Sequence, residues 1–220
     1  MKRSAALIEA VLHNRLEDAQ ALLRDEPSLA RATNPQGVSV LTLAAYTRNQ
    51  TAIDLLLQYR DQLDLFEALA LGRLDLVKEQ LTSTDIDRFS PDGFTPLGLA
   101  TFFGHEALVR WLLEQGADPN LPSQNDFRVS PLHSAAAISH VPLARLLLAH
   151  GAEVNAKQAS GVTALHSAAH NGQLELAQLL VEAGADLHAR MDNGLTPLSM
   201  ALQDGQGTVA AYLRERGASA

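Results

Sequence analysis

The sequence of 220 residues contains no cysteine, which excludes disulfides, thiolate metal centres, iron–sulfur clusters and cysteine nucleophiles and fits a reducing compartment. Long apolar runs are also missing, because none approaches the roughly 18 residues that a membrane-spanning helix needs. Basic residues are in the minority, with 17 Lys and Arg against 25 Asp and Glu, whereas a broad nucleic-acid or anionic-membrane surface is basic. We therefore expect a soluble, cytoplasmic protein whose partners include neither nucleic acid nor membrane.

The composition, with 46% apolar and 19% charged residues, is typical of a folded protein. The sequence also contains a repeated pattern. A hydroxyl residue before Pro-Leu or Ala-Leu recurs at positions 95, 130, 163 and 196, which are 35, 33 and 33 residues apart. Each hydroxyl residue is followed 21 residues later by Gly-Ala, at Gly116, Gly151, Gly184 and Gly217. A period of this length indicates a stack of repeated helical units.

These motifs resemble the ankyrin repeat family, whose period is 33 residues. The resemblance implies an all-α repeat solenoid with short β-hairpin fingers between successive helix pairs. Degenerate units beginning near Ala5, Ser39 and Leu63 extend the register backwards, so we expect about seven helix pairs.

The third unit begins only 24 residues after the second, about nine residues early for this period. Its connecting finger is therefore predicted to be missing. Leu65–Ala68 also looks like Leu7–Ala10, so the first and third units are both interpreted as cap-like. We expect an N-terminal block of degenerate repeats over 1–60 and a C-terminal block over 61–220 within one continuous solenoid, with weaker coupling near Tyr59–Leu63.

Side chains typical of catalysis or metal binding have a structural explanation in this register. His166 and His170, four residues apart, share one helix face and are the best metal candidates. However, His166 and His133 match the family's own structural histidine, and no carboxylate stands at ligand spacing. Gly205-Gln206-Gly207 lacks the third glycine and the lysine of a phosphate loop. We expect no metal, no cofactor and no enzymatic activity.

Phenylalanine is distributed unevenly, because five of the six lie between Phe89 and Phe127. Phe102 and Phe103 fall at the end of an inner helix, where the family presents variable side chains to a concave surface. The predicted partner-binding residues are Phe89, Phe94, Phe102, Phe103, Phe127, Arg128, Ile138, His170 and Asn171. We also expect Phe94, Phe102, Phe103, Phe127 and Ile138 to form one exposed apolar patch.

These residues favour a non-catalytic, monomeric scaffold that binds another protein through its finger tips and concave face. One alternative is a small-ligand or nucleotide sensor in which the rings stack on a base while Arg88 or Arg128 meets a phosphate. A second is that the rings only cover thin hairpins, or fill the gap left by the insertion around Pro122–Gln124.

Overall fold

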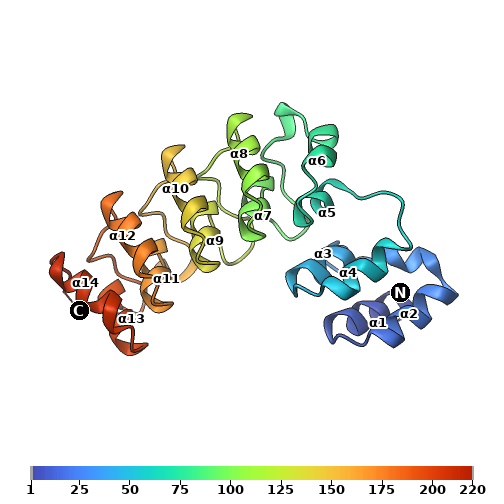
Figure 1. Cartoon of the computed structure of the whole chain (residues 1–220), viewed down its shortest axis with the longest axis horizontal. Coiled ribbons are helices and arrows are strands. Elements are labelled where there is room, and N and C mark those ends of the chain that lie inside the picture. Colours follow the sequence, from blue (N-terminus) through green and yellow to red (C-terminus); the bar gives the residue numbers. More distant parts are fainter. Residues whose placement is uncertain (1, 220) are drawn as a thin grey trace. The chain divides into compact units, whose positions relative to one another are not determined.

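The computed structural model describes residues 2–219, which form fourteen α-helices (Figure 1). Consecutive helices pack against each other in pairs, beginning with α1 on α2 and ending with α13 on α14. Contacts divide the chain into two compact units. The N-terminal unit is Met1–Thr82 with Phe89–Gly93, and the C-terminal unit is Ser83–Arg88 with Phe94–Ala220. The predicted all-α repeat architecture is confirmed.

Three helix pairs make up the N-terminal unit. Their inner helices pack in the order α1, α3, α5, and the outer helices α2 and α4 lie side by side. Leu7, Leu41 and Leu69 are fully buried between these layers. The helices are α1 (Lys2–Leu12), α2 (Leu16–Asp25), α3 (Val40–Tyr46), α4 (Gln50–Leu57), α5 (Leu65–Ala70) and α6 (Leu74–Gln80), with a short 3-10 turn, η1 (Pro27–Arg31).

Four helix pairs make up the C-terminal unit, and their inner helices begin where the repeated motif places a cap. The hydroxyl of Thr95 accepts a hydrogen bond from the Gly98 amide, and Pro96 occupies the first turn, where its missing N–H costs nothing. The helices are α7 (Pro96–Phe102), α8 (Glu106–Glu114), α9 (Pro131–Ala137), α10 (Val141–Ala149), α11 (Ala164–His170), α12 (Leu174–Glu182), α13 (Pro197–Gln203) and α14 (Gly207–Glu215).

The loops between helix pairs, the fingers, are held together by side-chain bonds to the neighbouring finger. The Asn120 side chain donates to the Gly151 carbonyl at 3.0 Å and accepts from the Glu153 amide at 2.7 Å. Asn155 makes the equivalent bonds one unit later. Within residues 2–219 the only isolated β-bridge joins Thr33 to Ser39, so hairpin strands in the fingers remain a prediction.

Only residues 58–64 connect α4 to α5, so the finger before the third pair is missing, as its spacing predicts. The finger leading to α7 replaces it, since its residues 89–93 pack within the N-terminal unit. A Cβ on Gly37 would lie 3.3 Å from the Pro91 Cβ, and the Tyr46 hydroxyl donates to Asp92 at 2.6 Å. Burial, and to a lesser extent this hydrogen bond, raises the pKa of the Tyr46 hydroxyl. The predicted boundary at residue 60 stays a prediction.

Candidate functional site

The predicted partner-binding residues are divided between the two units. Phe89 belongs to the N-terminal unit, and the other eight belong to the C-terminal unit. Phe89, Phe94, Phe102 and Phe103 are half-buried, whereas Phe127 is 68% exposed. One exposed patch of Phe94, Phe102, Phe103, Phe127 and Ile138 therefore stays a prediction, and Phe127 is the most exposed of these five residues.

Aromatic packing at the end of α7 explains why two of the rings are partly covered. Phe102 and Phe103 meet edge to face with centroids 5.3 Å apart, and Phe103 stacks on His105 at 6.2 Å. Gly104 follows them with a φ of +79°, and its position lies close to Ile138 of the next pair. These residues form a partly apolar surface at the turns between inner and outer helices.

Phe127 lies on a turn that is fixed by hydrogen bonds. The hydroxyl of Ser123 donates to the Asn125 side chain at 2.8 Å and accepts from the Val129 amide at 2.8 Å. The Asn125 side chain also accepts from the Phe127 amide at 3.2 Å. In the next finger, the Ala159 amide donates to the Phe127 carbonyl at 2.9 Å. The finger that carries the two-residue insertion therefore forms an ordered turn, and this turn places the Phe127 ring in solvent.

The end of α11 is polar. Nδ1 of the His170 ring lies 2.7 Å from a carboxylate oxygen of Asp204, and the backbone carbonyl of His170 accepts a hydrogen bond from the Gln206 side chain at 3.1 Å. Asn171 is exposed beside it as the C-cap of α11. These residues offer hydrogen-bonding groups rather than apolar area.

The buried histidines join neighbouring units through hydrogen bonds. Nδ1 of His133 bonds to the Ser130 hydroxyl at 2.7 Å, and Nε2 donates to the Val162 carbonyl at 3.0 Å. His166 bonds in the same way to Thr163 and to the Leu195 carbonyl. Burial lowers the pKa of both histidines. Among residues 2–219, no three His, Asp or Glu side chains gather as metal ligands would.

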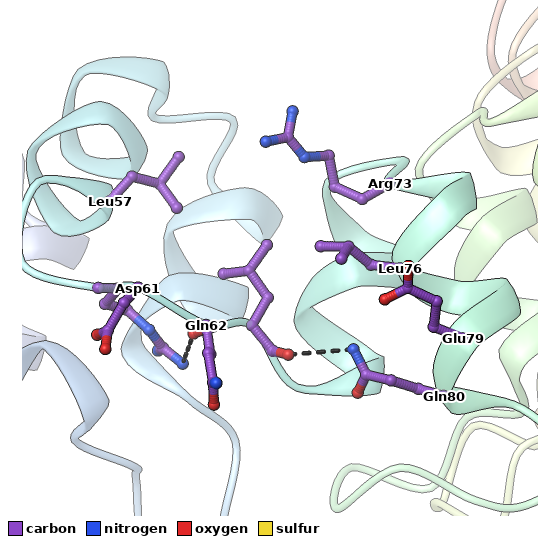
Figure 2. Close-up of a pocket in the computed structure, with 9 residues that line it drawn as sticks. Leu57, Asp61, Gln62, Arg73, Leu76, Glu79 and Gln80 are labelled. Atoms are coloured by element: carbon purple, nitrogen blue, oxygen red, sulfur yellow. Dashed lines mark hydrogen bonds between the residues drawn. The ribbon is translucent and has the colours of Figure 1, made fainter.

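Sequence reasoning did not identify a groove between α4 and α6 of the N-terminal unit. Its volume is about 540 Å³. Figure 2 shows Leu57 on one side and Arg73 and Leu76 on the other. The 24-residue spacing was the available signal, because a missing finger changes how adjacent outer helices meet.

The same junction contains a buried ion pair. The two terminal guanidinium nitrogens of Arg60 each donate to one carboxylate oxygen of Glu67 at 2.5 Å, and the two side chains are 7% and 1% exposed. Arg60 also donates to the carbonyls of Ala30 and Gln62. The pair thus fixes residues 58–64 against the helices on either side.

Stacked helix pairs whose fingers are joined by hydrogen bonds define a helical repeat protein. A family model described as "Ankyrin repeats (3 copies)" matches residues 7–123, 65–158 and 132–220. The chain belongs to the ankyrin repeat family. Ankyrin repeats are generally scaffolds for protein–protein interaction.

Several characterised proteins are similar to this chain. B-cell lymphoma 3 protein homolog of Mus musculus is 34% identical over 159 residues, covering 71% of this chain and 33% of that protein. DNA-binding protein RFXANK of Homo sapiens is 36% identical over 100 residues, covering 44% of this chain and 38% of that protein. Neurogenic locus notch homolog protein 1 of Mus musculus is 33% identical over 151 residues, covering 62% of this chain and 6% of that protein. The chain therefore spans well under half the length of each. None of the helices within residues 2–219 has the length and apolar character needed to cross a bilayer.

Proposed function

We propose that this chain is a non-catalytic scaffold that binds another protein through the finger tips and concave inner-helix face of its C-terminal unit. The observation that carries the proposal is Phe127, an aromatic side chain 68% exposed on a turn held by hydrogen bonds. Aromatic anchors surrounded by polar residues are typical hot spots of protein interfaces.

The geometry of the turn favours binding for an energetic reason. A turn that is already ordered loses little conformational freedom when a partner covers it, so more of the contact energy appears as affinity. The flanking Asp126 and Arg128 are both exposed. They would form a polar rim that sets orientation and specificity.

The test compares Phe127→Ala with a matched control, Leu12→Ala, because Leu12 of α1 is an exposed apolar side chain, at 41%, that belongs to the N-terminal unit and is not part of the proposed surface. Proteins captured from lysate with the wild-type chain are identified by mass spectrometry, and the recovered partner is titrated against each variant by calorimetry. We expect Phe127→Ala to weaken binding by about 2 kcal/mol or more and to leave the melting temperature unchanged.

Two results would contradict the proposal. One is a partner that binds Phe127→Ala as tightly as wild type. The other is a large drop in melting temperature for Phe127→Ala, because this would show that the ring stabilises the fold. Leu12→Ala controls for a general effect of removing exposed apolar area.

A further inference from the structure

The groove between α4 and α6 exposes a leucine that equivalent helices bury. Leu76 is the third residue of α6, and the third residues of α8, α10 and α12 are Leu108, Leu143 and Leu176. These three leucines are at most 1% exposed, whereas Leu76 is half-buried. Leu76 is therefore a core-type side chain without its usual cover.

The missing cover is an outer helix. Among the helices of the described chain, α2 packs on α4, α10 on α12 and α12 on α14, but α4 and α6 lack comparable side-by-side packing. The groove that results has a volume of about 540 Å³, within the range of binding pockets, and Leu57, Leu63 and Leu76 are its apolar lining.

The charges along the groove are not all neutralised within the unit. Arg60 pairs with Glu67, and Asp61 pairs with Arg31 at 3.2 Å. Arg73 and Glu79 also line the groove and are exposed, and neither side chain makes a hydrogen bond or ion pair with any residue from 2 to 219. Arg73 is the N-cap of α6 and Glu79 lies six residues later, which is roughly 9 Å along a helix axis.

The floor of the groove is fixed. The Gln80 side chain donates to the Leu63 carbonyl at 3.2 Å, as the dashed line in Figure 2 shows. The capping box of Asp64 and Glu67 and the Arg60–Glu67 pair hold the adjoining turn. A partner would therefore meet a preformed surface, which lowers the entropic cost of binding.

We infer that this groove is a second docking surface, which receives an amphipathic helix of another protein in the place of an outer-helix neighbour. The apolar face of that helix covers Leu57, Leu63 and Leu76. An acidic residue of the partner faces Arg73, and a basic residue faces Glu79. Aliphatic side chains at helical spacing, with this charge pattern, are the chemistry that a helix-binding groove selects.

The test selects binders for the full chain from a displayed library of helical peptides with randomised surface positions. We expect enriched peptides to carry aliphatic residues at i, i+3 or i+4, and i+7, with an acidic residue at one end. By fluorescence anisotropy, Leu76→Asp abolishes binding of the best peptide, whereas Leu12→Asp, at a 41% exposed leucine of the same unit, leaves binding unchanged. Phe127→Ala also has no effect, which separates this groove from the proposed finger surface.

A charge reversal keeps the test independent of folding. Arg73→Glu alters an exposed side chain and should weaken peptide binding by about tenfold, and replacing the peptide's acidic residue with lysine should restore it. The inference is overturned if no peptide of this pattern is enriched, or if binding survives both Leu76→Asp and Arg73→Glu. It is equally overturned if sedimentation shows dimers of the chain that Leu76→Asp dissociates, because the occupant is then a second copy.

Discussion

Replacing Glu67 with glutamine should be among the most destabilising single substitutions in the N-terminal unit. Glutamine keeps the volume of the side chain and an oxygen that can still accept from the Asp64 amide, a bond of 3.0 Å in this structure. The change removes the charge and replaces the oxygen that accepts from Arg60 Nη1 with an NH2 group, which cannot accept. It leaves Arg60, whose side chain is 7% exposed, without its counter-charge.

The expected cost follows from burial. Removing one partner of a buried ion pair typically costs about 3–5 kcal/mol, because the remaining charge stays desolvated. The matched control is Asp25→Asn, which breaks the Arg3–Asp25 pair at 2.9 Å, with side chains 49% and 70% exposed. Exposed pairs contribute below about 1 kcal/mol. Arg60→Met combined with Glu67→Gln should cost less than the sum of the two single changes, because no charge is then left alone.

Urea unfolding followed by two signals measures this effect. Far-UV circular dichroism reports both units, whereas the fluorescence of the single tryptophan, Trp111 in α8, reports the C-terminal unit. Each repeat of a repeat protein is stabilised mainly by its own contacts and those with its nearest neighbours. Glu67→Gln should therefore shift the dichroism transition more than the fluorescence transition. The reasoning is refuted if Glu67→Gln costs no more than Asp25→Asn.

Three further predictions concern the C-terminal unit. Burial lowers the pKa of His133 and His166 below the ordinary 6.5, so the unfolded chain binds protons more readily than the folded chain, and the free energy of unfolding should be highest above pH 6.5 and decrease below it. The double variant His133→Gln/His166→Gln should show a flatter pH dependence of melting temperature. An equally steep profile in that variant would contradict this assignment. Burial raises the pKa of Asp87, which accepts from the Asp118 amide at the position where later repeats use asparagine. Asp87→Asn should therefore raise the midpoint of urea unfolding, because asparagine carries no charge to desolvate, and a lower midpoint would contradict this. Gly116→Ala should lower the free energy of unfolding by about 1 kcal/mol, because Gly116 has a φ of +90°. Gly161→Ala should lower it more, because the new Cβ would lie 3.2 Å from backbone atoms of the neighbouring finger. Equal melting temperatures of the two variants would show that this contact is unimportant.

The sequence predicts the repeated part of the fold because each motif residue has the same surroundings in every unit. Thr95, Thr163 and Thr196 cap their helices. Ser130 stands at the same position, yet its hydroxyl bonds to the His133 ring and makes no capping bond to the backbone. Local pattern therefore predicts where a helix begins more reliably than which atoms bond there.

The candidate site was harder to predict because exposure depends on packing between residues that are far apart. The cluster of phenylalanines is visible in the sequence, but its rings do not share one environment: Phe103 stacks on His105, whereas Phe127 is exposed by the geometry of its turn. No spacing rule distinguishes these cases. The contact between Tyr46 and Asp92 spans 46 residues, and it exists because an intervening finger is missing.

The missing finger connects the unusual features of the N-terminal unit. In a regular repeat protein each unit is covered by its neighbours, so a shortened connection leaves several surfaces to be satisfied. Carbonyls at the junction are satisfied by Arg60, and the face of the preceding finger is covered by residues 89–93. The outer-helix face at Leu76 receives no equivalent cover from residues 2–219. Since burial of such leucines is a main source of repeat stability, this face is where an added helix would gain the most.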